Sequence, residues 1–300
     1  MPRSAVIVLS LVFALLAGVV VAAQPQGQGA SQAAQMAANA PVPAGAVVWV
    51  YRAEVKPGQA VAQEKAATAT ARAYARLPGA SSFLAMKSEI GPSEVWFVVP
   101  YLTVAGIDEE KDAMEKVPPA RMAEMREIGS QEDSHYSRTS SMLLKYRDDL
   151  SLGASFDVSA YRMMSVETYR VRPGRTEEFV GMGKKIVAAY KEAVPGLRFA
   201  GFEVLAGAPR GTFIFMMPMK KMAELVPGEA AEKAFADAMG KEAMAQLQKE
   251  SGSVIAGGEE FVFSFSPKMS ALPARYAAAD PFWRVTEPAA AKKPPEAPKK

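Results

Sequence analysis

Cysteine is absent from this sequence of 300 residues, and histidine occurs once, as His135. Without cysteine the chain forms no disulfide, thiolate metal site or iron–sulfur cluster, and it offers no attachment point for a bacterial lipoprotein anchor. Zinc and copper sites usually draw on several histidine or cysteine ligands, so we expect no metal site. The fold must therefore be held by its hydrophobic core alone, and 49% apolar residues suffice to build one.

Strong charge of one sign is also lacking. The net charge is +3, and the basic excess is concentrated at the chain ends, in Arg3 and in Lys292, Lys293, Lys299 and Lys300. The body between them is close to neutral, so we expect no nucleic-acid partner. A phosphate-binding loop with its lysine and a Gly-x-Ser-x-Gly motif are missing too, which leaves nucleotide hydrolysis and serine hydrolysis without support.

Long hydrophobic runs are lacking except for one at the N-terminus. Arg3 precedes the apolar run Ala5–Val21, and small residues follow at Ala22 and Ala23. This pattern predicts a signal peptide over residues 1–23 and therefore a periplasmic or secreted protein. The alternative is an uncleaved membrane anchor, but about 17 apolar residues lie at the short limit for a bilayer span. After cleavage we expect no transmembrane segment.

Two further segments have no hydrophobic period. Residues 24–45 are rich in Gln, Ala, Gly and Pro, and residues 287–300 consist mainly of Pro, Ala and Lys. Such compositions cannot bury enough apolar surface to offset the entropy lost on ordering. We predict a disordered linker at 24–45 and a disordered basic tail at 287–300.

An internal duplication is the strongest pattern in the remaining chain. Residues 55–58, Val-Lys-Pro-Gly, recur as Val-Arg-Pro-Gly at residues 171–174, an offset of 116 positions. Further matches follow in the same order at offsets of 116 to 118: Tyr74 with Tyr190, Pro78-Gly79 with Pro195-Gly196, Pro92 with Pro209, and Pro100 with Pro218. We predict a first repeat at 46–155 and a second at 160–286, the second with a C-terminal extension.

Each repeat is expected to run strand, helix, strand, strand, helix, strand. The predicted first strands are 47–55 and 165–171, and the helices after them are 60–77 and 175–194. Hairpins follow at 82–90 with 94–99 and at 198–205 with 212–217. Helical stretches come next, at 108–138 with an interruption at Pro118-Pro119 and at 228–250, and then a last strand. The second strand of each hairpin is apolar on both faces, which is typical of strands covered on both sides. This order predicts an α+β fold of two tandem ferredoxin-like βαββαβ units, packed sheet to sheet as a barrel-like body.

Two such units, each opening with a strand, Val-x-Pro-Gly and a helix, resemble the dimeric α/β-barrel superfamily. The similarity is closest to NIPSNAP-like and antibiotic-biosynthesis-monooxygenase-like members, and it covers residues 47–152 and 164–267. The repeat ends, at 146–151 and 280–283, resemble exported bacterial proteins whose role is unknown. The superfamily includes cofactor-free monooxygenases, haem enzymes and small-ligand regulators. The resemblance therefore implies the fold and no particular reaction, and the shared turn motif carries no catalytic residue.

No motif fixes a reaction, so the first hypothesis is a small-ligand-binding module. Its pocket is expected between sheet and helices, lined by Trp49, Tyr51, Trp96 and Tyr169, and suited to a small apolar or aromatic molecule. A cofactor-independent or haem-dependent oxidoreductase, for example a monooxygenase, is the second hypothesis. A structural envelope protein is the third. A monomer and a homodimer both remain open.

Two residues are weaker catalytic candidates. Glu167 is expected on an apolar strand face, where burial raises the pKa of a carboxyl and suits it to act as a base. The alternatives are a register shifted by one residue or an ion pair with Arg170 or Arg198 across the sheet. His135 could be an axial haem ligand, because haem needs only one protein nitrogen. The alternative is a histidine at a helix end in a polar stretch, and no cofactor is predicted.

Overall fold

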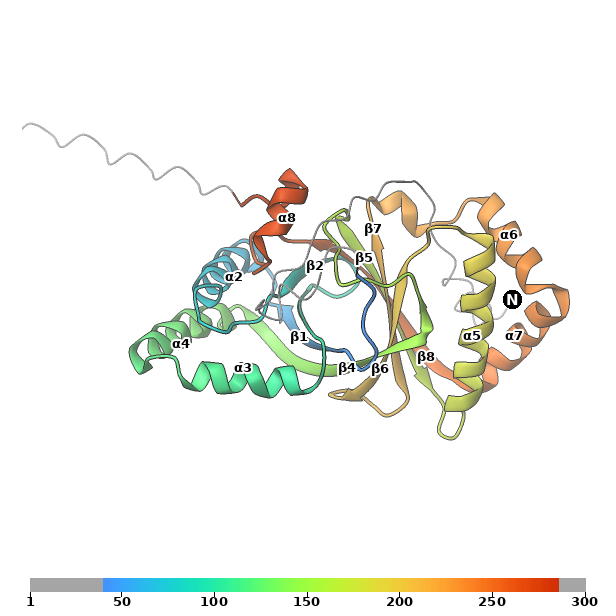
Figure 1. The fold of residues 1–300 in the computed structure, drawn as a ribbon, viewed down its shortest axis with the longest axis horizontal. Coiled ribbons are helices and arrows are strands. Elements are labelled where there is room, and N and C mark those ends of the chain that lie inside the picture. Colours follow the sequence, from blue (N-terminus) through green and yellow to red (C-terminus); the bar gives the residue numbers. More distant parts are fainter. Residues whose placement is uncertain (1–39, 286–300) are drawn as a thin grey trace, which may run out of the picture.

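The computed structural model describes residues 40–285, and one order of elements occurs twice (Figure 1). The first half contains β1 (Val47–Val55), α2 (Ala60–Tyr74), β2 (Leu84–Ile90), β3 (Glu94–Tyr101), α3 (Ala105–Glu115), α4 (Pro119–Asp133) and β4 (Tyr136–Leu152). The second half contains β5 (Met163–Val171), α5 (Thr176–Ala193), β6 (Phe199–Ala206), β7 (Thr212–Met219), α6 (Glu229–Met239), α7 (Lys241–Val254) and β8 (Ile255–Phe265). A short 3-10 helix (Met222–Leu225) follows β7, and α8 (Ala274–Ala279) and a second 3-10 helix (Pro281–Trp283) end the described chain.

The strands form one closed barrel in the order β1-β3-β2-β8-β5-β7-β6-β4, with antiparallel pairing between all neighbours for which a register is defined. Each half contributes four adjacent strands. Two seams join the halves, one between β2 and β8 and the other between β4 and β6. The expected α+β barrel is therefore confirmed, and the two sheets are continuous by hydrogen bonding as well as packed face to face. Closure removes the open edges at which a sheet could pair with another chain.

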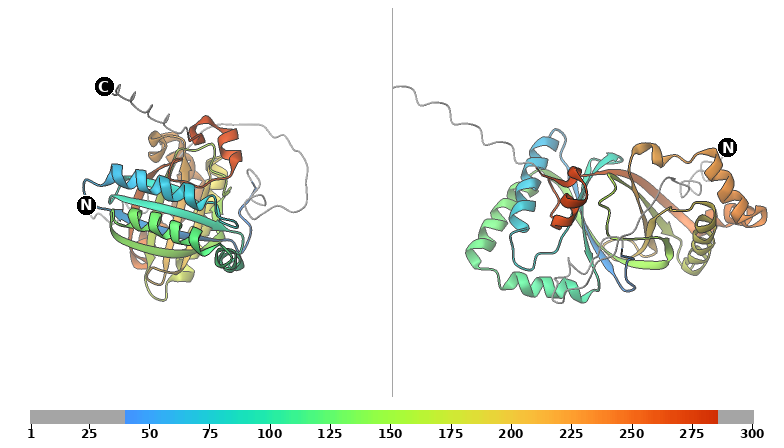
Figure 2. Two further views of the ribbon diagram at one scale, coloured as in Figure 1. Left: turned by 90° about the vertical axis from the view of Figure 1, so that its left-hand side faces the viewer. Right: turned by 45° about the horizontal axis from the view of Figure 1, so that its top comes forward.

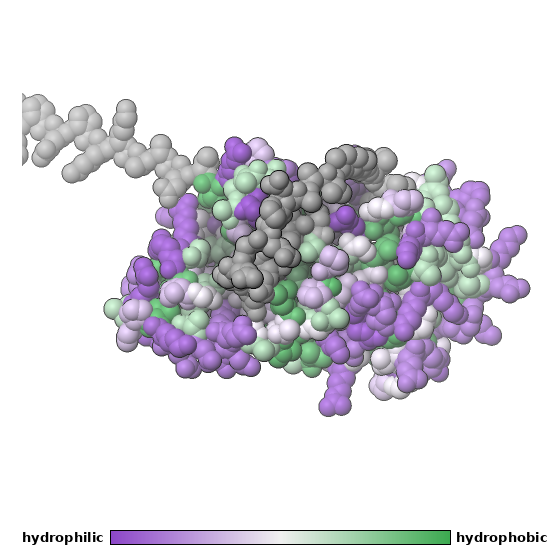
Figure 3. Space-filling model, in the orientation of Figure 1, coloured by the Kyte–Doolittle hydropathy of each residue, from purple (hydrophilic) through white to green (hydrophobic). Residues whose placement is uncertain are grey.

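Helices cover the barrel on two opposite sides. Figure 1 places α2, α3 and α4 on one side and α5, α6 and α7 on the other, and Figure 2 shows the first group lying across the strands. On the face drawn in Figure 3, hydrophilic residues dominate both helical sides, and apolar residues gather in the middle between them.

Alternate residues of each strand point into the barrel, as the two-residue period of a strand requires. Val48 and Val50 of β1, Trp96 of β3 and Leu144 of β4 meet side chains from the second half in one buried cluster. The partners from that half include Val166, Ile214, Phe202, Phe261 and Phe263. The interior is therefore a single core to which both halves contribute.

Most element ends differ from expectation by a few residues, and three further differences matter for the fold. The helical stretch predicted at 108–138 is divided into α3 and α4 at Pro118, as expected, but its predicted end was too late, because β4 already begins at Tyr136. The predicted helix 228–250 is two helices, since Gly240 interrupts it with a φ of 75°. The linker at 24–45 was wrong at its end: Val42 is 5% exposed, packs into the barrel cluster and donates its N–H to the Ala154 carbonyl at 3.3 Å.

The signal peptide at 1–23, most of the linker and the basic tail at 287–300 lie outside the described residues. Within residues 40–285, no helix combines the length and apolar character that crossing a bilayer demands.

Candidate functional site

A cavity of about 760 Å³ lies between the outer face of the first half's sheet and the helices α2, α3 and α4. We call it the helix–sheet cavity. Six aromatic side chains line it: Trp49, Tyr51, Tyr74, Phe83, Phe97 and Tyr101. Its volume falls within the usual range of about 300–1,000 Å³ for small-molecule sites, and its aromatic walls are typical of them.

The small side chains of α2 leave this space open. Ala67 and Ala71 line the cavity from the helix, and Thr70 lies beside them. In the second half, α5 covers the corresponding sheet face with Phe179, Met182 and Ile186, all buried.

The difference between the halves follows from side-chain volume at matching positions. The residues 116 positions before Phe179, Met182 and Ile186 are Gln63, Ala66 and Thr70. The larger side chains reduce the space under α5 to a void of about 30 Å³, since Phe179 packs on Phe213 with ring centroids 4.7 Å apart. Within residues 40–285, the first half therefore has room for a ligand beneath its first helix, and the second half does not.

Glu110 of α3 is the polar centre of the helix–sheet cavity. Its carboxylate accepts hydrogen bonds from the hydroxyl of Tyr74, from the hydroxyl of Tyr101 at 2.5 Å and from the backbone N–H of Ser81 at 3.1 Å. Burial, reinforced by Glu110, raises the pKa values of Tyr74 and Tyr101 far above the ordinary tyrosine range. Both hydroxyls therefore remain protonated donors that fix the carboxylate in place.

Glu132 of α4 is a second carboxyl on the cavity wall, and it is 6% exposed. The hydroxyl of Tyr136 donates to its carboxylate, and the Gln63 amide donates to the Tyr136 oxygen at 2.9 Å. Burial raises the pKa of Glu132 and also that of Tyr51 on the sheet side. A carboxyl with a raised pKa at an aromatic wall is a candidate for proton exchange with a bound molecule.

The four aromatic residues predicted to line one pocket lie in three places. Trp49 and Tyr51 line the helix–sheet cavity. Trp96 points into the barrel core, where its indole N–H donates to the Glu94 carboxylate at 2.6 Å. Tyr169 is buried in the cluster under α5, in the other half of the molecule. Residues that point to opposite faces of one sheet cannot share a site. Trp96 on β3 is therefore separated from Trp49 and Tyr51 on β1.

Sequence reasoning missed Glu110, Tyr101 and Glu132. In the sequence Tyr74 stands out only as the match of Tyr190 in the second repeat. The two tyrosines differ in the structure: Tyr74 donates to Glu110, whereas the Tyr190 hydroxyl is buried with no hydrogen-bond partner among the described residues. The alanine-rich sequence of α2 was the feature that could have indicated this cavity, because a helix with small residues on its buried face leaves space beneath it.

Glu167 has the raised pKa that was predicted for it, but it does not line the helix–sheet cavity. The side chain is 7% exposed, and the Tyr169 hydroxyl donates to its carboxylate at 2.5 Å. Burial raises the pKa of Glu167 to about 7, against the smaller opposing effect of that hydrogen bond. Glu260 lies opposite on β8, and its charge adds to the rise.

This shift predicts a dependence of stability on pH. The folded protein holds a proton on Glu167 that the unfolded chain, with a pKa of 4.5, releases earlier. The stabilisation is therefore complete below about pH 4.5 and is lost as the pH rises through about 7, a fall on the order of 3 kcal/mol in unfolding free energy. Urea unfolding of Glu167→Gln should show a flatter profile between pH 4.5 and 8. Glu259→Gln, a change at an exposed neighbour on β8, should keep the wild-type profile, and equal profiles for all three proteins would contradict the assignment.

His135 lines neither the helix–sheet cavity nor a second large cavity at one end of the barrel. It follows the C-terminal end of α4, where its Nδ1 is 3.1 Å from the Gln59 amide oxygen. A haem in either cavity would not meet the imidazole, so the residues present do not fit a histidine-ligated haem. Within residues 40–285, no three acidic or histidine side chains come together as a metal site.

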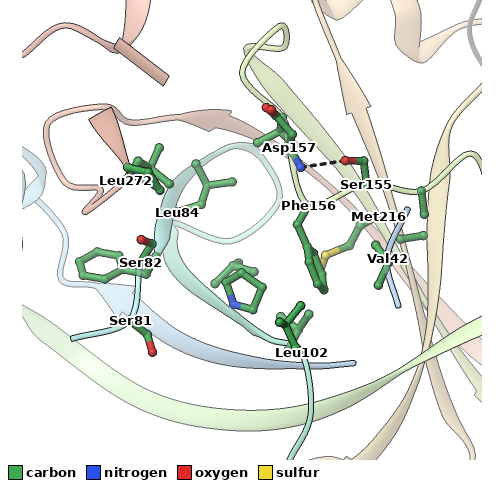
Figure 4. Close-up of a pocket in the computed structure, with 18 of the residues that line it drawn as sticks. Val42, Ser81, Ser82, Leu84, Leu102, Ser155, Phe156, Asp157, Met216 and Leu272 are labelled. Carbon is green, nitrogen blue, oxygen red and sulfur yellow. Dashed lines mark hydrogen bonds between the residues drawn. The ribbon is translucent and has the colours of Figure 1, made fainter. Parts of the chain in front are cut away.

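A second large cavity, of about 820 Å³, lies at one end of the barrel and is called here the barrel-end cavity. Figure 4 shows it between Leu84 and Leu272 on one side and Val42 and Met216 on the other, with Phe156 reaching into it. Phe83 and Glu110 belong to the walls of both cavities. The two spaces are therefore neighbours.

Comparison with solved structures finds similar folds at low sequence identity. An anthrone oxidase-like protein is 12% identical, with 76% of this chain and 94% of the other covered and a TM-score of 0.49. A proposed monooxygenase of Fusobacterium nucleatum is 12% identical, with coverages of 74% and 93% and a TM-score of 0.48. A chlorite dismutase variant from Candidatus Nitrospira defluvii is 10% identical, with coverages of 75% and 93% and a TM-score of 0.45.

At these values the likenesses carry no argument about ligand or reaction. No protein-family model matches the sequence, and the search of curated proteins gives no match.

Proposed function

We propose that this protein binds a small aromatic molecule in the helix–sheet cavity of its first half. The observation that carries the proposal is an aromatic-lined space of about 760 Å³ with a carboxylate, Glu110, fixed by three donors at its wall. Aromatic walls favour a flat apolar body, and the carboxylates of Glu110 and Glu132 favour a hydroxyl or amine that donates a hydrogen bond. The ligand class is thus a phenol-like or aromatic amine compound.

The two halves are tandem ferredoxin-like units in this proposal, and of the two first helices, α2 and α5, α2 covers the binding space. Support comes from the repeated order of elements and from the contrast between the alanine-rich α2 and the large apolar residues of α5. The cleaved signal peptide would place the protein in the periplasm or outside the cell. A purely structural role is disfavoured, because such a role needs no cavity of this size.

Oxidoreductase chemistry without a cofactor is the second candidate, and Glu132 is the observation that favours it. A buried carboxylate beside a phenol-like ligand can take its proton, which leaves an electron-rich anion that dioxygen can oxidise. Consumption of dioxygen in step with loss of the bound aromatic compound would identify this reaction.

A cavity-filling pair tests the binding proposal. Ala71 lines the cavity, whereas Ala69 is exposed on the same helix and does not. Ala71→Phe should weaken the binding of 2-naphthol at least tenfold by occupying its space, and Ala69→Phe should bind as the wild type does. Binding is measured by quenching of Trp49 fluorescence, because Trp49 lies on the cavity wall while Trp96 and Trp283 pack in the barrel cluster.

Trp49→Phe provides the control for the signal. This variant should lose the quenching while isothermal calorimetry still detects 2-naphthol. Equal affinity in Ala71→Phe and Ala69→Phe would overturn the proposed site, and so would a wild-type protein that binds no 2-naphthol.

A further inference from the structure

The barrel-end cavity has a composition different from that of the helix–sheet cavity. Side chains from both halves line its deep part, and they point into the barrel from β2, β3, β5, β6 and β7. These residues are Leu84, Val98, Met164, Ala200, Phe202 and Met216. The deep part is therefore apolar and suits a hydrocarbon body, with room for a drug-sized molecule in about 820 Å³.

Arg198 stands on the wall of this cavity, just before β6 begins at Phe199. Its side chain is half-buried, and no acidic side chain or hydrogen-bond acceptor pairs with its guanidinium in the part of the chain that the structure describes. Most half-buried arginines here are paired, as Arg52 is with Glu94 at 2.8 Å and Arg147 with Asp149 at 2.9 Å. A half-buried guanidinium without a counter-ion at an apolar cavity favours an anionic group.

The other charged groups on the wall do not serve as its partner. Glu110 is held by its three donors, and Asp157 accepts the backbone N–H of Ser159 at 2.9 Å. Glu109 is exposed on α3. Arg275 lies against Tyr276, with its guanidinium carbon 5.4 Å from the ring centroid. Arg198 is therefore the group at this opening that would bind an anion.

The stem of Arg198 is held in place by the neighbouring chain. A Cβ atom at Gly153 would lie 3.2 Å from the Cγ atom of Arg198, so the stem packs directly on the backbone there. A guanidinium with a fixed stem loses less freedom on binding, and its planar fork matches both oxygens of a carboxylate.

We propose that the barrel-end cavity is a second binding site, which takes an apolar carboxylic acid with its hydrocarbon body in the barrel and its carboxylate on Arg198. The site is separate from the helix–sheet cavity and calls for a different ligand: an anion here, and a hydrogen-bond donor beside Glu110 there. A singly charged carboxylate matches this opening better than a doubly charged phosphate headgroup, because the opening offers one uncompensated cation rather than a cluster.

Calorimetric titration with decanoate and with decan-1-ol at pH 8 tests this site. The wild type should bind decanoate, and Arg198→Gln should weaken that binding by at least tenfold while changing the binding of decan-1-ol less than threefold, because only the acid uses the guanidinium. Arg210→Gln removes an exposed arginine outside the cavity and should leave both affinities unchanged. Ala200→Phe, which fills the apolar part, should weaken both ligands.

Three results would overturn the proposal. The wild type could fail to bind decanoate, Arg198→Gln could bind decanoate as tightly as the wild type, or an Ala200→Phe protein that melts cooperatively could bind both ligands with wild-type affinity. Ala71→Phe should bind decanoate normally, and decanoate should not quench Trp49. Failure of this site and failure of the aromatic site are therefore distinguishable.

Discussion

Replacing Gly207 with alanine is expected to destabilise the protein by about 4 kcal/mol, through strain at a positive φ and loss of hydrogen bonds at a barrel seam. Gly207 follows β6 and has a φ of 90°. A Cβ atom there would lie 2.0 Å from the Ser141 carbonyl oxygen and 2.8 Å from the Met142 Cα. Both contacts are to the backbone of β4, so relief requires movement of the seam between β4 and β6.

Gly196 provides a matched control. Its φ is 89°, and a Cβ atom there would have no neighbour within 4 Å. Gly196→Ala should therefore lose only about 1–2 kcal/mol from the left-handed backbone conformation itself. Urea unfolding at one pH compares the two variants with the wild type. If both substitutions lower the free energy of unfolding by the same amount, β6 does not approach β4 closely at this seam.

The strands and the first helix of each half were predictable because local patterns determine them. The β1 bounds match the prediction at both ends, since a run of β-branched and aromatic residues ends at Pro57-Gly58. The α5 helix was equally clear, because large apolar residues recur at helical spacing from Phe179 to Ala189. Closure into a barrel followed from strands that are apolar on both faces, such as β7.

The candidate site was predictable only in part. The two-residue period of a strand puts Trp49 and Tyr51 on one face of β1. That period does not say whether helices cover the face tightly or leave a cavity. That outcome depends on the volumes of α2 side chains and on where α3 carries Glu110, which lies 36 residues from its partner Tyr74. Such long-range pairing has no signature in a local pattern.

The misplaced residues show the same limit. Trp96 was grouped with Trp49 as a pocket aromatic, yet it points to the opposite face of the sheet and pairs with Glu94 beneath Arg52. Arg198 was considered only as a possible ion-pair partner of Glu167, within the strand expected at 198–205, and not as a binding residue. Its significance comes from the absence of a partner within residues 40–285, which only the assembled barrel reveals.

The fragment 47–152, expressed without the rest of the chain, is expected to show no cooperative melt as a monomer. Its inner sheet face would expose Val48, Val50, Trp96 and Leu144 to water, and all four are at most 2% exposed in the whole protein. Its edge strands β2 and β4 would lose their partners β8 and β6. Unpaired edges and an exposed apolar face together favour aggregation or self-pairing over a folded monomer.

Light scattering coupled to gel filtration, followed by thermal melts, distinguishes these outcomes. Addition of the fragment 160–285 should restore a cooperative melt, because it supplies both missing strands and the other half of the core. A homodimer of 47–152 would also be consistent with the need to cover the inner sheet face, since a second copy can cover it. A monomeric fragment with a sharp cooperative transition would show that each half has a sufficient core of its own. The barrel-end cavity would then be a space between two independent bodies, and the apolar site proposed within it would lose its basis.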